Sequence, residues 1–412
     1  MRDDPERLRF EIAARDGAAR TGRLQTAHGP VSTPAFVPLA TRGSVRSLDP
    51  VDVAALGYEL ILGNTFHLFL APGAERVERL GGLHEMMAWE RAIITDSGGF
   101  QIFSLAHGHV ADEIKGRRGR QATGGAVLEI SERGVRFRSY VDGDERFMGP
   151  EESMATQAAL GSDIALAFDE CTPYHADRDY TARSTERTHR WLGRCIDWHR
   201  AHGPRRQALF GIVQGGVHED LRRDAAATVA AADVDGLAIG GTLGRDKPQM
   251  YEVVGLTASL LPAEAPKHLL GIGEPDDLLE GIGHGIDLFD CAVPTRLARH
   301  GMVLAPLPED RFRYDVSRAA HAESRLPLAD GCPCPTCSRH TRAYVHYLVR
   351  ARELTAVRLL TIHNLAFLGE LVAGARRAIA AGHFARYREG ILAGEAPWSL
   401  TPSSARSGFA AR

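Results

Sequence analysis

The sequence is poor in several features, each of which would indicate a class of protein. Its 412 residues have a formal net charge of only -3, contain 7% aromatic residues and include six cysteines. No run approaches the roughly 18 apolar residues of a membrane helix, and the N-terminal segment MRDDPERLRF lacks the apolar core of a signal peptide. We therefore expect a soluble, cytoplasmic protein with no membrane partner, and the overall charge gives no indication of nucleic-acid binding.

Positive charge is nevertheless concentrated in one region. Between Arg296 and Arg352 there are ten arginines, no lysines and five acids, which leaves an excess of five positive charges. Such an excess favours a bound polyanion, although it is also compatible with a solvated face.

Short apolar runs alternate with segments of helical periodicity along most of the chain. The predicted strands are 35–39, 59–62, 92–94, 164–168, 208–213, 236–239, 268–272 and 286–289. The predicted helices between them are 49–56, 150–160, 178–202, 218–232, 249–261 and 275–283. Eight strands joined by helical crossovers predict an α/β protein with a (β/α)8 barrel. The alternative, an open doubly wound sheet, lacks the GxGxxG motif expected after the first strand.

The chain around this barrel is predicted to have four parts. They are an N-terminal β plug at 1–33, the catalytic barrel at 34–325, a zinc-binding helical subdomain at 326–395 and a disordered tail at 396–412. The barrel contains an insertion at 107–145, with a loop rich in Gly and Arg at 107–125 and a hairpin at 135–143. The subdomain is expected to contain helices at 342–354 and 364–379.

Polar or glycine residues directly follow seven of the predicted strands. They are Asn64, Asp96, Asp169, Gln214, Gly240 with Gly241, Gly271 to Gly273, and Asp290. Because the loops after barrel strands carry the active site, we expect these residues to meet at one end of the barrel.

The segment from Gly285 to Gly301 combines a strand, an acid and two arginines. Asp290 ends the strand, and Pro294 is expected to turn the chain outward toward Arg296 and Arg299. An acid at the end of a buried strand costs several kcal/mol unless it is paired or used. The pattern predicts a carboxylate beside phosphate-binding arginines, and the alternative is an Asp that caps a surface loop.

The polar residues suit the recognition of a purine-like base. A carboxylate accepts from N–H donors and an amide both donates and accepts, so Asp169 and Gln214 together fit the edge of guanine. Backbone N–H groups at Gly240 and Gly241 can receive its carbonyl. The glycines of Ser97-Gly98-Gly99 let backbone amides approach a ligand, and Phe100 either stacks on the ring or belongs to the core. Asp96 and Asp290 remain for glycosidic chemistry through an oxocarbenium-like transition state.

A cysteine cluster predicts a metal site outside the barrel. Cys332, Cys334 and Cys337 form a CxCxxC motif, and His363 follows 26 residues later. Three thiolates and one imidazole with no open position predict one structural Zn2+. His340 and His346 are alternative fourth ligands; His363 is preferred because the start of a predicted helix would fix its ring. The other reading is a set of reduced surface thiols.

Several motifs carry a resemblance to one family. They are GNTFHL (63–68), TDSGGFQ (95–101), FDECTPY (168–174), GIVQGG (211–216), FDCAVPTR (289–296), CPCPTC (332–337) and TIHNL (361–365). From about residue 8 to 390 the chain closely resembles the bacterial-type tRNA-guanine transglycosylases. The resemblance implies a (β/α)8 barrel with a zinc subdomain. It also implies exchange of the wobble guanine of GUN-anticodon tRNAs for preQ1, a 7-deazaguanine, by double displacement, in a homodimer.

The resemblance also implies roles for single residues. Asp290 matches the nucleophile that attacks the ribose, and Asp96 matches the proton acceptor for the incoming base. The positions that match base-contacting residues are Asn64, Ser97, Gly98, Gly99, Phe100, Asp169, Gln214, Gly240, Gly241 and Leu270. The positions that match RNA-contacting residues are Gly271, Ile272, Gly273, Glu274, Pro275, Asp276, Asp277, Thr295, Arg296, Leu297, Ala298 and Arg299.

The chain departs from the family at two positions. Arg245 stands where a Glu is usual, which leaves the preference among preQ1, preQ0 and queuine open. Glu274 stands where a Lys often meets phosphate, so affinity for RNA is expected to rely more on the arginines. Two other functions remain possible. The first is a non-catalytic RNA-binding barrel, but the presence of both Asp96 and Asp290 argues against it. The second is a zinc-dependent nucleosidase, which would place metal ligands at the strand ends, whereas the cysteine cluster lies outside the barrel.

Overall fold

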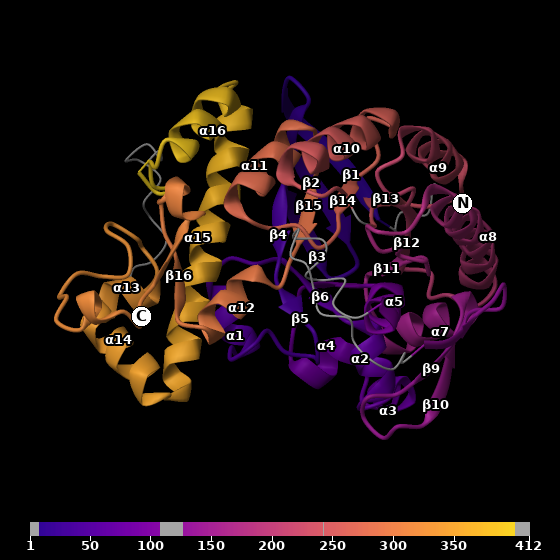
Figure 1. Ribbon diagram of the computed structural model, residues 1–412, viewed down its shortest axis with the longest axis horizontal. Helices are drawn as coiled ribbons and strands as arrows, with labels where there is room; N and C mark the ends of the chain where they lie inside the picture. The colour runs from indigo at the N-terminus through magenta and orange to yellow at the C-terminus, as the bar shows by residue number, and fades with distance from the viewer. Residues whose placement is uncertain (1–7, 108–126, 242, 400–412) are drawn as a thin grey trace.

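The computed structural model describes residues 8–107, 127–241 and 243–399 (Figure 1). Its centre is a parallel sheet in the order β4-β15-β14-β13-β12-β11-β7-β6-β5. The strands are β4 (Ala35–Val37), β5 (Leu39–Ala40), β6 (Leu60–Gly63), β7 (Ala92–Thr95), β11 (Ile164–Leu166), β12 (Ala208–Val213), β13 (Gly236–Ile239), β14 (Lys267–Leu269) and β15 (Leu288–Asp290). Each overlaps a predicted strand.

The sheet is nearly closed through its first strand, which Pro38 divides. β4 pairs with β15 and β5 pairs with β6, so the two halves face opposite neighbours. Pro38 cannot donate a hydrogen bond, but its carbonyl accepts one from the Leu62 N–H at 2.9 Å. The nine strand segments are thus the eight strands of the predicted (β/α)8 barrel, and the predicted fold class is confirmed.

The six helices predicted around the barrel all form. They are α1 (Pro50–Ala55), α7 (Pro150–Leu160), α8 (Arg178–His202), α9 (Glu219–Ala231), α10 (Lys247–Leu260) and α11 (Pro275–Gly283). Helices of five to nine residues show too few turns to establish a period. α1 and α11, which are this short, were predicted, but other short helices were missed. They are α2 (Thr65–Leu70), α3 (Ala74–Arg79), α4 (Gly82–Met87), α5 (Gly99–His107), α12 (Val293–Arg299), α13 (Pro335–Arg339) and α16 (Phe384–Leu392).

One of these missed helices corrects a prediction. Pro294 was expected to turn the chain outward, but it lies in the first turn of α12, which carries both Arg296 and Arg299. Proline is tolerated there because the first N–H groups of a helix have no partner within the helix.

An antiparallel sheet covers the amino-terminal end of the barrel. It consists of β1 (Arg9–Asp16), β2 (Ala19–Thr26) and β3 (Gly29–Thr33). Leu24 and Val31 of this sheet pack into the same apolar cluster as the side chains that fill the barrel, such as Phe210 and Leu288.

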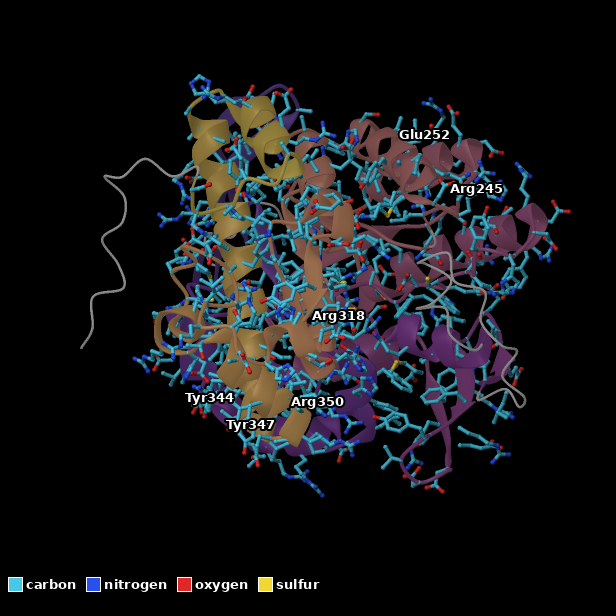
Figure 2. All side chains as sticks on the ribbon, turned by 60° about the vertical axis from the view of Figure 1, so that its left-hand side comes forward. Arg245, Glu252, Arg318, Tyr344, Tyr347 and Arg350 are labelled. Atoms are coloured by element: carbon cyan, nitrogen blue, oxygen red, sulfur yellow. The ribbon has the colours of Figure 1, made fainter. Side chains whose placement is uncertain are left out.

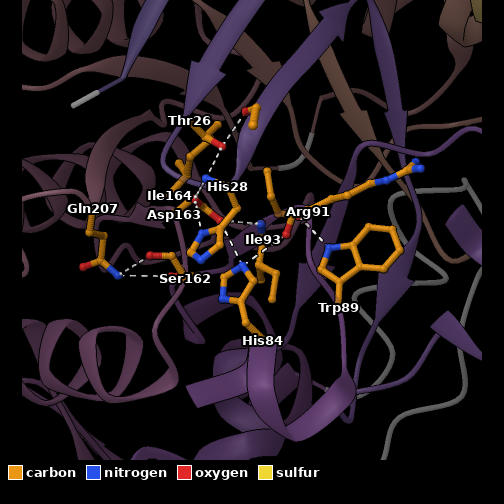
Figure 3. Close-up of polar contacts among 12 residues, drawn as sticks. Thr26, His28, His84, Trp89, Arg91, Ile93, Ser162, Asp163, Ile164 and Gln207 are labelled. Carbon is orange, nitrogen blue, oxygen red and sulfur yellow. Dashed lines mark hydrogen bonds and ion pairs between the residues drawn. The ribbon is translucent and has the colours of Figure 1, made fainter. Parts of the chain in front are cut away.

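Two buried aspartates begin strands at this covered end. Asp287, just before β15, is bound by the Arg20 guanidinium of β2. Asp163, just before β11, receives hydrogen bonds from the Ile93 N–H at 2.8 Å and from His28, and His84 lies 3.3 Å away (Figure 3). These contacts connect the N-terminal sheet to the floor of the barrel.

The insertion after α5 is described only in part. β8 (Val127–Ile130), β9 (Val135–Arg138) and β10 (Glu145–Met148) form an antiparallel sheet in the order β10-β9-β8. The predicted hairpin at 135–143 therefore exists, but its second strand is β10 and a third strand joins it. The predicted loop at 107–125 lies, except for its first residue, outside the described residues.

The C-terminal region packs beside the barrel (Figure 1). It contains β16 (Met302–Leu304), β17 (Arg313–Asp315), two 3-10 turns (Pro308–Asp310 and Ala319–His321), α14 (Arg342–Ala351) and α15 (Leu354–Ala380). α15 begins ten residues earlier than the predicted helix at 364–379. It is long and apolar enough to cross a membrane, but 67% of its most apolar window is buried inside the protein, as in the core helix of a soluble protein.

The chain remains packed at the start of the predicted tail. Trp398 is 9% exposed, donates to the Asp330 carbonyl at 3.0 Å and meets the Phe367 ring edge-on. Residues 400–412 lie outside the described part of the chain.

Candidate active site

A cavity of about 180 Å³ opens at the carboxyl-terminal end of the barrel strands. The residues from the sequence prediction that line it come from six different strand ends. They are Asn64, Asp96, Ser97, Phe100, Asp169, Gly240, Gly241, Leu270, Gly271, Asp290 and Arg296. The remaining wall is mainly apolar, with Leu62, Leu166 and Ile212 among its residues. The structure thus brings together side chains that are up to about two hundred positions apart.

Asp96 follows β7 and is held by the loop after β6. Its carboxylate accepts hydrogen bonds from the Asn64 amide and from the Thr65 N–H at 2.8 Å. The pKa of Asp96 is raised to about 7: burial is the largest cause, the charges of Asp290 and Asp169 add to it, and the N–H donors of Thr65 and Gly98 oppose it. A carboxyl group with this pKa can accept and return a proton near neutral pH.

Asp169 follows β11 and lies between two donors. Ser97 Oγ donates to one of its oxygens at 2.7 Å, and Gln214 Nε2 donates to the other at 2.6 Å. Burial raises its pKa to about 6, although both hydrogen bonds lower it. Among the described residues, Gln214 Oε1 is buried and has no hydrogen-bond partner. Gln214 itself does not line the cavity.

The glycines of the site allow close packing behind the wall. A Cβ at Gly241, where φ is +87°, would lie 2.4 Å from Gln214 Oε1, and one at Gly99 would lie 2.3 Å from the Asp169 carbonyl. Gly98 and Gly99 are not part of the cavity lining, and the Gly99 N–H donates to Ser97 Oγ. These two glycines therefore position Ser97 and Asp169 from behind, whereas Gly240 and Gly241 face the cavity.

Asp290 ends β15 and is 8% exposed. Its Oδ1 accepts from the Gly271 N–H at 3.3 Å and lies 2.9 Å from His268 Nε2. Asp290 and Asp96 are two carboxylates that open into one cavity, as glycosidic chemistry requires.

Arginines gather beside this carboxylate. Arg296 lines the cavity, and Arg299 lies one turn further along α12. Burial lowers the pKa of Arg299, and the positive charges of Arg46 and Arg296 lower it further. The positive charges of Arg46, Arg296 and Arg299 therefore lie close enough together to affect one another.

The two segments that match RNA-contacting residues are only partly exposed. Ile272, Glu274, Asp277, Thr295 and Ala298 are all buried. Glu274, at the start of α11, is paired with Arg311 at 2.7 Å and with Lys247 at 3.2 Å. Arg313 lies 3.7 Å from the same carboxylate, so this acid is paired with three cations.

Sequence analysis missed three buried residues that support the site. Thr65 binds Asp96 through its N–H and its hydroxyl. Arg222 of α9 donates to the carbonyls of Gly216, Val213 and Gly240, which fixes two of the loops behind the base. His268 lies beneath Asp290. Arg222 and His268 are a charged and a polar residue inside apolar or helical patterns, which is the signal that could have drawn attention to them.

The predicted cysteine cluster forms, at the N-terminus of α13. The Sγ atoms of Cys332, Cys334 and Cys337 lie 3.7, 3.6 and 3.3 Å from His363 Nδ1. A tetrahedral ion with bonds of about 2.3 Å to sulfur and about 2.0 Å to nitrogen would separate these atoms by about 3.5 Å. The four residues fit one metal ion with no position left open.

The reason given for choosing His363 was wrong, although the residue is in the cluster. His363 lies in the third turn of α15, and its Nε2 is fixed by the Leu304 carbonyl at 2.8 Å. His346 is turned toward the Val316 carbonyl at 2.8 Å and does not join the group.

Comparison with known proteins agrees with this geometry. Residues 16–396 match the family model described as Queuine tRNA-ribosyltransferase. The Queuine tRNA-ribosyltransferase of Roseiflexus sp. (strain RS-1) is 49% identical over 393 residues, covering 92% of this chain and 98% of that protein. The protein of the same name from Symbiobacterium thermophilum is 45% identical, covering 94% of this chain and 93% of that protein. The chain therefore belongs to the queuine tRNA-ribosyltransferase family and is a pentosyltransferase of the tRNA-guanine transglycosylase type.

Proposed function

We propose that the protein exchanges the wobble guanine of GUN-anticodon tRNAs for preQ1 through a covalent ribosyl-enzyme intermediate. The observation that carries this proposal is the shared cavity of Asp96 and Asp290, whose wall also holds Asp169 against Gln214. In this proposal Asp290 attacks the ribose, Asp96 transfers protons, and Asp169 binds the base.

In the first displacement, an oxygen of Asp290 attacks the ribose C1′ as the bond from C1′ to guanine N9 breaks. The bonding electron pair leaves with the base, whose N9 takes the proton of Asp96. In the second, N9 of preQ1 attacks C1′, the ester bond breaks, and its electron pair returns to Asp290. Asp96 accepts the proton of the incoming base, which suits its pKa of about 7. Two inversions preserve the anomeric configuration.

Base recognition is assigned to the strand ends opposite Asp290. Asp169 accepts from N–H groups of the purine edge, Gln214 Oε1 accepts a further one, and the Gly241 N–H donates to the carbonyl. Phe100, at the start of α5, stacks on the ring. Arg245 does not line this cavity: its side chain is 71% exposed, lies at the surface and pairs with Asp246 (Figure 2). The aminomethyl group of preQ1 therefore meets no side chain of Arg245 in the cavity.

The tRNA is expected to approach over α12 and the start of α11. Arg46, Arg296 and Arg299 offer positive charge for phosphates of the anticodon loop. Lys247 and Arg311 are paired with the acids at the start of α11, so they add little net charge.

The metal is assigned as one structural Zn2+ bound by Cys332, Cys334, Cys337 and His363. When bound, it joins α13 to α15 and takes no part in base exchange. Substituting Cys334→Ser should remove zinc and lower the melting temperature without changing base selectivity. A variant with full zinc content and unchanged melting would contradict the assignment.

A second copy of the chain is proposed to cover an exposed apolar patch. Tyr344 and Tyr347 of α14 are 43% and 63% exposed (Figure 2), and Leu354 and Val51 are 85% and 74% exposed. α1 lies next to α15 through the ion pair of Asp52 with Arg358, so these residues belong to neighbouring elements. Tyr347→Asp should convert a cytoplasmic homodimer to monomers in sedimentation, and monomeric wild type would contradict the proposal.

Release of labelled guanine from tRNA tests the function directly. We expect release that requires added preQ1. Release without preQ1 would indicate hydrolysis, and no release would indicate a binding protein.

A further inference from the structure

A histidine lies inside the barrel directly beneath the proposed nucleophile. His268 of β14 is fully buried and is paired in register with Ala238 of β13 and Leu288 of β15. Residues paired in register on parallel strands point to the same face, and both partners belong to the cluster that fills the barrel. His268 therefore points inward, one layer below Leu270 and Asp290.

The imidazole contacts one particular atom. His268 Nε2 lies 2.9 Å from Asp290 Oδ1, which also accepts from the Gly271 N–H at 3.3 Å. The Nε2 approach is too oblique to count as a hydrogen bond, and Nδ1 has no partner within the described part of the chain. Such contacts in ligand-free enzymes often align only when substrate binds.

A buried polar ring with no other partner requires an explanation. Leaving a buried imidazole without hydrogen bonds costs about 1–3 kcal/mol, so an apolar residue would pack there more favourably. The side chains beside it are apolar, and His268 itself does not line the cavity. Among the described residues, the polar atom found in contact with the ring is Asp290 Oδ1, so its role concerns that oxygen.

We propose that His268 is a positioning residue that holds Asp290 Oδ1 and presents Oδ2 to the ribose. This inference rests on the proposed function, in which Asp290 is the nucleophile. With Nε2 as the donor, two N–H groups fix Oδ1 and prevent rotation of the carboxylate. In the ribosyl ester Oδ1 becomes a carbonyl oxygen. When preQ1 N9 attacks C1′, the electron pair of the C1′–Oδ2 bond returns to the carboxylate, and the same donors stabilise the negative charge that develops.

The role can be tested by moving the donor atom. In His and Gln, Nε2 is separated from Cβ by the same number of bonds, so His268→Gln retains a donor near Oδ1. The amide of His268→Asn is one bond shorter and serves as the matched control. His268→Phe retains the ring shape and removes the donor.

We expect His268→Phe and His268→Asn to lower kcat for guanine exchange by about 10- to 100-fold, with KM for tRNA unchanged, as loss of one charge-assisted donor predicts. His268→Gln should restore kcat to within about fivefold of wild type, and the covalent tRNA adduct in denaturing gels should form more slowly in the Phe and Asn variants. Equal rates for Gln and Asn, or wild-type kcat in the Phe variant, would overturn the proposal.

Two controls separate this inference from the proposed function. If Asp290→Asn exchanges guanine like the wild type, the proposed function fails, whatever His268 does. If Asp290→Asn is inactive and the His268 variants are unaffected, only the inference about His268 fails. Melting curves detect misfolding, and the Gln and Asn pair still decides the question should the Phe variant unfold.

Discussion

Aspartates are buried at both ends of the barrel, but the groups that surround them differ. At the covered end, Asp163 and Asp287 precede strands and are bound by histidine, arginine and backbone N–H groups. At the open end, Asp96 and Asp290 lie at the carboxyl-terminal ends of strands and line one cavity. The charge of Asp290 raises the pKa of Asp96.

The difference appears in the pKa of comparable groups. Burial opposes ionisation of Asp163, but hydrogen bonds from His84, the Ile93 N–H and His28 outweigh it and lower its pKa. For Asp96, burial and two neighbouring carboxylates outweigh two N–H donors, and the pKa rises to about 7. Burial also raises the pKa of Asp287, against the lowering effect of its hydrogen bonds with Arg20, so the contrast in pKa holds between Asp163 and Asp96 and not between all aspartates of the two ends.

The largest expected effect removes the charge of Asp290. Asp290→Asn should lower guanine exchange by at least about a thousandfold, because an amide is a poor nucleophile and leaving group. Binding of tRNA, measured by gel shift, should change little. Wild-type turnover would remove Asp290 from the mechanism and with it the contrast between the two ends.

The next largest effect should come from the covered end. Asp287→Ala leaves the Arg20 guanidinium buried without a carboxylate, which should cost about 3–5 kcal/mol of unfolding free energy. Arg20→Met combined with Asp287→Leu should lose less than Asp287→Ala alone, as measured in urea. A single variant as stable as wild type would show that this pair does not fasten the N-terminal sheet.

A smaller effect of opposite sign is expected at Asp96. Its raised pKa means that the folded state disfavours ionisation of this carboxyl group. The resulting loss of unfolding free energy is absent below about pH 4 and complete above about pH 7. Asp96→Asn should therefore stabilise the protein by about 2 kcal/mol at pH 8 and by little at pH 4, while exchange is lost. If the Asp96→Asn variant were less stable than wild type at pH 8, the hydrogen bonds to the Asp96 carboxylate would outweigh the cost of burying its charge.

The smallest effect is expected at Asp163. Its pKa is lowered, so its contribution to stability is present above about pH 4 and is lost as pH falls through the folded-state value. Asp163→Asn should destabilise by about 1–2 kcal/mol at pH 7, and the difference from wild type should shrink below pH 4. If the stability of Asp163→Asn relative to wild type varied with pH as that of Asp96→Asn does, the two carboxyl groups would not differ in the way proposed.

Much of the fold could be predicted because its signals are local. Long helices such as α8 carry a full apolar period and a capping Asp177, and each barrel strand is an apolar run bounded by turn residues. Short helices such as α12 were missed, and α15 was predicted too short, because its first ten residues follow α14 after only two connecting residues.

The sequence by itself determined the strand and helix alternation, the acids after the strands and the three cysteines of the metal site, because these depend on residue type and spacing. Only the tertiary structure decided which groups face those acids. Arg20 meets Asp287, and His268 meets Asp290, through pairings of strands remote in sequence. The pKa of a buried carboxylate depends on such neighbours within a few ångströms, and spacing along the chain does not specify them.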